Sequence, residues 1–405
     1  MAIEMIEVEE FNQGTQIKVI GVGGGGGNAV AHMMQRGVQG VQFVCANTDA
    51  QALTHCSAPK VIQLGVNGLG AGGKPAKGRE AAEAAVDEIR AAIDGAHMLF
   101  ITAGMGGGTG TGAAPVIARV AKEMGILTVG VVTKPFEWEG RKRMGNADDG
   151  VAELEANVDS LIVILNEKLL GVLGDDVSQA EAFAHANDVL KNAVGGISEI
   201  INEYGGVNVD FEDVRAVMGE PGKAMMGTAS ATGPDRARIA AEEAVACPLL
   251  EGVDLSGAKG VLVLVTASRA SLKLSESKLA METIGAYAAA DANIIFGAAY
   301  DDSLGDEMRV TVVATGLSRQ KSTLTVVPTY EPAMATGTHG YVPNIGGVGV
   351  NMVDPSSIPT YQRVGKPDVW SSHPNRVNAS AKVNALSSGG MDDFEIPAFL
   401  RRQAD

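Results

Sequence analysis

A glycine run between a predicted strand and a predicted helix constrains this chain more than any other stretch. Six of the nine residues from 104 to 112 are glycine. The apolar residues 97–102 before the run predict a buried parallel strand, and the residues from Ala113 predict the first turns of a helix. Glycines let the backbone approach a ligand closely, and the free N–H groups and dipole of a helix N-terminus attract anions. The run therefore predicts a phosphate site to which Thr109 and Thr111 add hydroxyl donors.

Six predicted strands in the first half of the chain end in loops that are rich in glycine or carry polar side chains. Helical segments separate the strands, among them one helix predicted over residues 79–93. This alternation predicts an α/β fold, in which helices cover both faces of a parallel sheet. Ligands of such sheets bind outside the carboxyl ends of the strands, so the six loops point at one ligand. The strands are predicted at residues 16–20, 41–46, 60–64, 97–102, 126–132 and 161–165.

Two familiar nucleotide motifs can be compared with the sequence, and the first is that of a dehydrogenase. Gly21, Gly23 and Gly26 fit the pattern G-x-G-x-x-G, with Asp49 available to a ribose. This interpretation leaves the glycine run at 104–112 unexplained, and the chain offers no obvious acid or base for hydride transfer.

The second motif, that of a P-loop, is incomplete. The residues from Gly68 to Lys74 fit G-x-x-x-x-G-K, but Pro75 stands where a P-loop needs Ser or Thr to bind magnesium.

A third interpretation explains both the glycines after the first strand and the glycine run at 104–112. It is a nucleoside triphosphatase of another architecture that holds a polyphosphate between these two loops.

A long helix is predicted over residues 178–204, opened by a capping box of Ser178 and Glu181. Its apolar residues recur at helical spacing, which is typical of a helix that packs on a core. Phe183 and Asn187 lie one turn apart near its start. An aromatic ring can stack on a base and an amide can hydrogen-bond to the edge of that base, so both are candidates for base recognition.

Two carboxylates follow the long helix. Asp210 and Asp213 are three residues apart and share a face at the start of another predicted helix. Carboxylates at that position cap a helix and interact favourably with its dipole. The residues alone leave capping and catalysis open as alternatives.

The rest of the chain divides by composition. A smaller α/β domain is predicted from strands at 260–266, 293–299 and 309–314 and helices from Ala237 and over 273–289. Proline-rich polar sequence then predicts a disordered linker. Apolar residues return at the end, where we expect a partner-binding peptide. The predicted parts are a flexible tail (1–14), a nucleotide-binding domain (15–177), the long helix (178–204), a C-terminal domain (205–318), the linker (319–390) and the terminal peptide (391–405).

Composition excludes several classes of function. A net charge of −16 argues against sequence-independent binding of nucleic acid. Cys45, Cys56 and Cys247 are scattered, which predicts a reducing compartment without a disulfide framework, and the histidines show no metal-ligand spacing. The acidic N-terminus and the lack of an unbroken apolar span predict a cytoplasmic protein that does not insert into membranes.

Four segments resemble the tubulin/FtsZ family. Residues 107–112 match its glycine-threonine signature, and residues 47–51, 208–213 and 393–401 resemble its FtsZ branch. The resemblance covers residues 16–318 almost without interruption, plus the terminal peptide. It departs at Trp138, where the family often has Phe, and in the linker, which has no recognisable sequence.

The resemblance implies a GTPase that polymerises head to tail into the bacterial division ring at midcell, on the inner face of the membrane. It implies GTP or GDP with Mg²⁺ as the ligand, and as partners other copies of the chain, membrane tethers such as FtsA and ZipA on residues 391–405, and other division regulators. By similarity, the phosphates contact Gly24, Gly25, Asn28, Gly72, Gly73, Gly107, Gly108, Thr109, Gly110 and Thr111, the ribose contacts Glu139 and Arg143, the guanine contacts Asn166, Phe183 and Asn187, and Asn47 and Asp49 also line the site.

The resemblance also favours catalysis over mere capping for the carboxylates after the long helix. By similarity, Asn208, Asp210 and Asp213 form a loop that completes the nucleotide site of the next subunit. We therefore expect hydrolysis only in the assembled filament.

Overall fold

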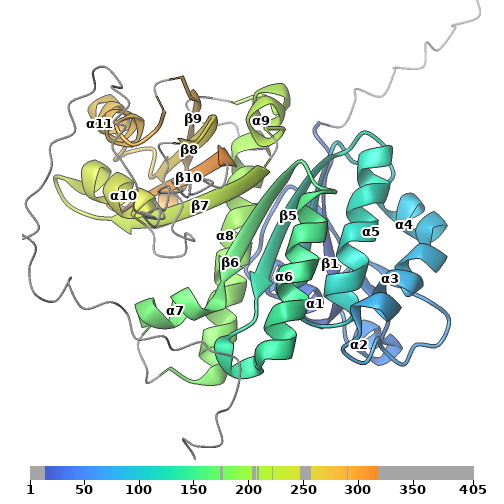
Figure 1. The fold of residues 1–405 in the computed structure, drawn as a ribbon. Helices are drawn as coiled ribbons and strands as arrows, with labels where there is room; N and C mark the ends of the chain where they lie inside the picture. The colour runs from blue at the N-terminus through green and yellow to red at the C-terminus, as the bar shows by residue number, and fades with distance from the viewer. Residues whose placement is uncertain are drawn as a thin grey trace, which may run out of the picture. The chain divides into compact units, whose positions relative to one another are not determined.

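The computed structural model describes residues 14–173, 177–202, 207, 209–220, 222–246, 257–289 and 291–317, without side chains at 170–173 (Figure 1). Four predicted features lie outside the described residues: the N-terminal tail up to residue 13, Asn208, the linker and the terminal peptide.

One sheet of ten strands runs through the described residues in the order β3-β2-β1-β4-β5-β6-β7-β10-β8-β9. Neighbours from β3 to β7 are parallel, and β10 pairs antiparallel with both β7 and β8. The predicted α/β fold built on a parallel sheet is confirmed. The strands are β1 (Ile17–Val22), β2 (Val41–Asn47), β3 (Lys60–Gln63), β4 (Met98–Gly104), β5 (Leu127–Lys134), β6 (Ser160–Leu165), β7 (Gly222–Ala231), β8 (Gly260–Ala267), β9 (Asn293–Tyr300) and β10 (Met308–Leu317).

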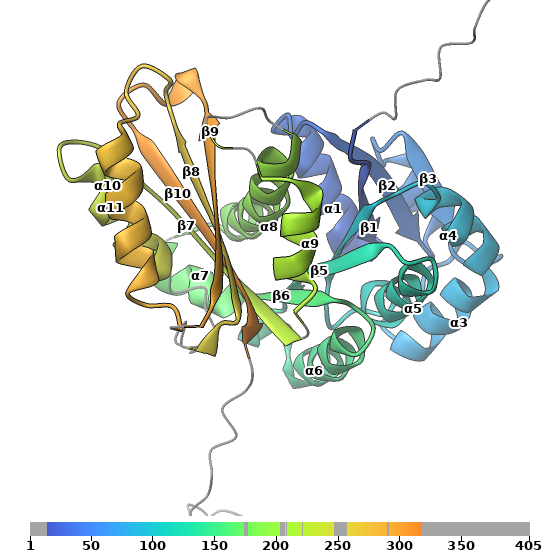
Figure 2. The same cartoon turned by 90° about the horizontal axis from the view of Figure 1, so that it is seen from above.

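Helices cover both faces of the first six strands (Figure 2). Helices α1 and α8 pack on one face together with α9, and α3 to α6 pack on the other, while α10 and α11 cover β7 to β10. No described helix is long and apolar enough to cross a bilayer. The helices are α1 (Gly23–Gln35), α2 (Ala50–Thr54), α3 (Pro75–Ala84), α4 (Val86–Ile93), α5 (Thr109–Glu123), α6 (Arg141–Glu155), α7 (Asn166–Leu173), α8 (Gln179–Asn202), α9 (Phe211–Met218), α10 (Arg236–Val245) and α11 (Leu274–Gly285), with a short 3₁₀ turn, η1 (Glu137–Glu139).

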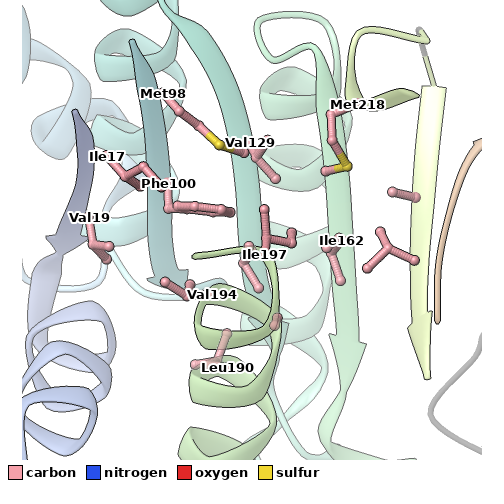
Figure 3. Packing of buried hydrophobic residues seen from close by; sticks show 14 of the residues in the cluster. Ile17, Val19, Met98, Phe100, Val129, Ile162, Leu190, Val194, Ile197 and Met218 are labelled. Atoms are coloured by element: carbon pink, nitrogen blue, oxygen red, sulfur yellow. The ribbon is translucent and has the colours of Figure 1, made fainter. Parts of the chain in front are cut away.

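The long helix α8 begins as the sequence predicts. The Ser178 N–H donates to Oε2 of Glu181 at 3.0 Å, and the Glu181 N–H donates back to the Ser178 hydroxyl at 3.3 Å. Hydrogen bonds from the Ser178 side chain and backbone hold the pKa of the Glu181 carboxyl below its usual range. Farther along, Leu190, Val194 and Ile197 bury their side chains against the sheet (Figure 3). The capping box thus sets where this core-packing helix starts.

Two helix predictions are wrong in their bounds. The helix predicted over 79–93 is two helices, because the backbone at Ala85 (φ −112°, ψ 25°) leaves the helical conformation between α3 and α4. Helix α5 begins at Thr109, four residues before the predicted start, which places Pro115 inside the helix. The earlier start extends α5 into the glycine run itself.

Candidate nucleotide-binding site

The strand order places a switch point between β1 and β4, because the chain winds outward from them in opposite directions. The two glycine-rich loops follow these two strands and meet there. A Cβ on Gly23, whose φ is +73°, would lie 2.9 Å from the Gly110 nitrogen, and one on Gly25 would lie 3.1 Å from Gly104. Glycine at these positions is therefore what lets the starts of α1 and α5 approach each other.

A third loop, before α3, packs against the same point. A Cβ on Gly108 would lie 2.9 Å from the nitrogen of Lys74 and 3.2 Å from that of Gly73. Gly72 and Gly73 adopt φ values of +58° and +68°, a conformation that favours glycine. The starts of α1, α3 and α5 consequently converge on one region.

The three converging helix N-termini suit an anion. Within α1, α3 and α5 the first turn holds no acidic residue, and no side chain caps the N-terminus. The first N–H groups of each helix have no acceptor within the helix and can donate to a ligand, and the helix dipoles add positive potential at the same place. Four predicted phosphate contacts also face open space, since a Cβ built on Gly24, Gly72, Gly73 or Gly107 would meet no described heavy atom within 4 Å apart from its own neighbours along the chain.

The threonines of the glycine run hold the loop together. Thr111 is 2% exposed, and its hydroxyl accepts from the Gly106 N–H at 2.9 Å. The hydroxyls of Thr109 and Thr48 lie 2.6 Å apart and join the run to the end of β2. Both threonines thus shape the cradle, and their contacts with a phosphate stay predictions.

Asn47 and Asp49 organise the turn between β2 and α2. Asn47 is buried, and its Oδ1 accepts from the Asp49 N–H at 3.2 Å. The Asp49 carboxylate caps α2 by accepting from the N–H groups of Gln51 at 2.9 Å and Ala52 at 3.3 Å. One Asp49 oxygen is therefore engaged in the fold, and contact of either residue with a nucleotide stays a prediction.

Glu139 and Arg143, the predicted ribose contacts, form an ion pair beside the glycine run. Arg143 Nε lies 3.1 Å from Glu139 Oε2, and Glu139 Oε1 accepts from the Phe136 N–H at 2.9 Å. A Cβ on Gly106 would lie 2.6 Å from the Arg143 carbonyl oxygen. The structure therefore brings this pair to the phosphate cradle.

Three aromatic rings gather near the start of α8. Phe136 stacks on Trp138 with ring centroids 5.7 Å apart, and Phe183 meets Phe136 edge to face at 5.4 Å. Phe183 is 39% exposed and Trp138 59%, so both present apolar surface that a flat base could cover. The sequence reasoning singled out Phe183 but missed Phe136, whose only signal was its place in the loop after β5.

The predicted guanine contacts include a buried polar atom without a partner. Asn166, at the start of α7, is 4% exposed, and its Oδ1 finds no hydrogen-bond partner among the described residues. Such an atom costs about 1–3 kcal/mol unless something donates to it. Asn187 lies one turn beyond Phe183 and is partly buried. The ring N–H and the amino group of guanine are hydrogen-bond donors, and either could donate to Asn166 Oδ1.

Asp210 and Asp213 are exposed at the N-terminus of α9. The Asp210 carboxylate caps the helix by accepting from the Asp213 N–H at 2.8 Å, so the capping alternative is confirmed for Asp210. In Figure 1, α9 lies at one end of α8. A catalytic role for either aspartate stays a prediction.

Comparisons with known proteins identify the family of this chain. Residues 16–174 match the domain described as "Tubulin/FtsZ family, GTPase domain", and residues 222–318 match "FtsZ family, C-terminal domain". The chain is 50% identical over 403 residues to the cell division protein FtsZ of Pseudomonas putida and 51% identical over 403 residues to that of Azotobacter vinelandii, covering 98% of this chain and 99% of each relative. Among solved structures, the "FtsZ dimer, empty" of M. jannaschii is 42% identical with a TM-score of 0.72, covering 78% of this chain and 95% of that one. The chain therefore belongs to the tubulin/FtsZ family of GTPases.

Proposed function

We propose that this chain binds GTP where α1, α3 and α5 converge and hydrolyses it to GDP and phosphate within a filament of its own copies. The observation that carries the proposal is the meeting of three helix N-termini that no described side chain caps. A polyphosphate has the charge and the number of acceptor oxygens that such a cradle favours.

The base is guanine, and Asn166, Phe183 and Asn187 select it. Support comes from the unpartnered Asn166 Oδ1 and from the exposed ring of Phe183. A site that hydrogen-bonds one base leaves buried groups unpaired with another, and such discrimination can reach about 10⁴-fold. We therefore expect adenine nucleotides to bind far more weakly in a competition assay.

Mg²⁺ enters with the nucleotide. The described residues hold no group of three or more His, Cys, Asp or Glu side chains able to bind a metal ion. Mg²⁺ usually keeps several waters and binds through phosphates plus one or two protein ligands, which needs no such group.

The catalytic carboxylates come from the next subunit. Helix α8 has 24 residues, so it spans about 36 Å between the base site and the region of Asp210. Carboxylates at the end of α8 opposite the base site cannot orient water on the nucleotide of their own chain. Head-to-tail stacking would bring Asp210 and Asp213 to the neighbour's γ-phosphate, where they position the attacking water.

The cellular role is that of a cytoskeletal protein of the division ring. The matched relatives are named cell division proteins, and one solved relative is titled a dimer. Residues 391–405, outside the described residues, would bind the membrane tethers FtsA and ZipA. Deleting these residues should leave GTP turnover intact and abolish recruitment of filaments to tether-coated bilayers.

Light scattering recorded together with phosphate release tests the proposal. Asp210→Asn removes the charge but keeps a good helix cap, so it should bind GTP normally and hydrolyse it about 10²–10³-fold more slowly. Glu212→Gln removes a charge from the same exposed turn of α9 and should turn over GTP like the native chain. Native turnover by Asp210→Asn, or full turnover by dilute protein that does not scatter light, would contradict the shared site.

A further inference from the structure

A cavity of about 190 Å³ adjoins the phosphate cradle between α1, β2 and α2. Two of the chain's three cysteines, Cys45 and Cys56, line it together with the glycine-rich start of α1. The proposed GTPase reaction uses neither thiol.

The two cysteines line the same cavity but differ in exposure. Cys45 lies in β2 and is buried, whereas Cys56 follows α2 and is partly exposed. Burial, and then a hydrogen bond with Cys56, raises the pKa of the Cys45 thiol far above its usual range. Because the thiolate is the reactive form, a reagent that enters the cavity meets Cys56 as the accessible nucleophile and Cys45 as a neighbouring, protonated thiol.

We propose that Cys45 and Cys56 form a redox-modified pair, which a hydroperoxide converts to a disulfide, and that the disulfide weakens nucleotide binding in the adjoining cradle. The effect on the nucleotide rests on the proposed function, whereas formation of the disulfide does not. Disulfides in reducing compartments are usually transient and redox-sensing, which fits a pair that is reduced at rest.

The chemistry proceeds in two steps. The Cys56 sulfur attacks the peroxide, so that an S–O bond forms, the O–O bond breaks, and the leaving alkoxide or hydroxide takes up a proton. The Cys56 sulfur loses two electrons and becomes a sulfenic acid. The Cys45 sulfur then attacks the Cys56 sulfur, an S–S bond replaces the S–O bond, and hydroxide leaves as water with the Cys45 proton. A dithiol reverses the modification by thiol–disulfide exchange.

The disulfide would close a loop that includes part of the nucleotide site. Between the two cysteines lies Thr48, whose hydroxyl is 2.6 Å from that of Thr109 and whose carbonyl accepts from the Gly70 N–H at 3.0 Å. A disulfide holds its sulfurs about 2.05 Å apart, closer than two hydrogen-bonded thiols. Cys56 must therefore move toward β2 and draw α2 into the cavity that Gly24 and Asn28 border.

The experiment uses the full chain in a Cys247→Ala background, which removes the third thiol. Hydrogen peroxide is added, free thiols are blocked, and peptide masses are measured together with the affinity for a fluorescent GDP analogue. We expect one peptide pair joined through Cys45 and Cys56 and an affinity for the analogue that is lower by about tenfold or more. Dithiothreitol should separate the two peptides and restore the affinity. Cys56→Ser and, separately, Cys45→Ala should bind the analogue like the reduced chain, and neither should form the joined peptide pair when peroxide is added.

If oxidation of the chain that holds both cysteines stops at Cys56 sulfenic or sulfinic acid, the proposed Cys45–Cys56 disulfide is wrong. A joined pair with unchanged affinity would overturn its coupling to the cradle. Failure of the reduced chain to bind the analogue would instead overturn the proposed function, and the peptide masses would still decide whether the disulfide forms.

Discussion

Asn166 buries a side-chain oxygen that the described residues leave without a donor. In Asn166→Ala this cost disappears with the side chain, so the free energy of unfolding without nucleotide should change by less than about 1 kcal/mol. The affinity for GDP should fall about tenfold, and the preference for guanine over adenine should shrink. Calorimetric titration with GDP and ADP, beside urea unfolding, measures both effects.

Asn157→Ala is the matched control for Asn166. The Asn157 amide already donates to the Glu153 carbonyl at 2.8 Å, so its loss should cost about 1 kcal/mol of stability and leave the GDP affinity unchanged. Equal GDP affinity in Asn166→Ala and the native chain would exclude Asn166 from the base site.

Some residues of the candidate site could be predicted from the sequence, and others could not. The position of Phe183 near the start of α8 was predictable, because the capping box marks where the helix begins and helical spacing places Phe183 in its first turns. Phe136 follows a proline in a loop, and only its ring contacts with Trp138 and Phe183 reveal its part in the cluster. Asp210 satisfies a capping and a catalytic pattern equally well, because both patterns ask for the same side chain at the same place.

At the scale of elements, Gly150 lets α6 pack against the start of α5. A Cβ on Gly150 would collide with Cγ2 of Thr111, whose hydroxyl is held by the Gly106 N–H. Gly150→Ala should therefore destabilise the fold by about 1–3 kcal/mol and weaken nucleotide binding by disturbing the glycine run. Gly145→Ala, on the same helix with no described atom within 4 Å of its Cβ, should gain up to about 1 kcal/mol. Thermal unfolding with and without GDP compares the two, and equal behaviour would refute the packing argument.

A buried ion pair joins α10 to α11. Arg236 donates to both Glu276 oxygens at 2.8 and 2.9 Å, with side chains only 6% and 14% exposed. Glu276→Gln should cost about 3–5 kcal/mol, because it leaves Arg236 buried without its counter-charge. Glu242→Gln breaks an exposed pair with Arg238 on α10 and should cost less than about 1 kcal/mol.

The same pair predicts a dependence on pH. Hydrogen bonds from Arg236 lower the pKa of Glu276 from its ordinary value of 4.5. A carboxyl whose folded pKa is depressed contributes stability above its unfolded pKa and loses it as the pH falls through the folded one. The stability gap between the native chain and Glu276→Gln should therefore be full at pH 7 and shrink below about pH 4.5. Urea unfolding across that range measures the gap, and a constant gap would contradict the prediction.

Helices and strands could be predicted where the hydrophobic pattern of a segment agrees with the glycine or polar residues that bound it. The six parallel strands before α8 are apolar runs bounded by glycine or polar loops, and all six lie within two residues of their predicted bounds at both ends. Strand β7 was not predicted, because Gly222–Ala231 mixes glycine, lysine, methionine and serine without a regular period. Its conformation depends on pairing with β10 and β6, which are distant in sequence.

At the scale of the whole molecule, a site shared between copies can be tested by mixing two inactive variants. Asp210→Asn keeps the nucleotide face, whereas Gly108→Val forces a side chain against Ala71 and Lys74 and disables that face. In a random head-to-tail filament of equal parts, about one interface in four joins an intact face to an intact loop. Phosphate release should therefore return to about a quarter of the native rate per molecule if the variants assemble together. No recovery in filaments that contain both variants would mean that each chain hydrolyses its own nucleotide.

The uncapped starts of α1, α3 and α5 have a consequence for the lifetime of the chain. Each helix start carries about half a positive elementary charge, and three held together repel one another until an anion arrives. GDP at about 100 times its dissociation constant would add roughly 2.7 kcal/mol to the free energy of unfolding, whereas guanosine, which lacks phosphates, would add little. The melting temperature should rise with GDP and hardly change with guanosine. A fall in guanine nucleotides would then expose the emptied chain to proteolysis, so that its abundance follows the nucleotide supply.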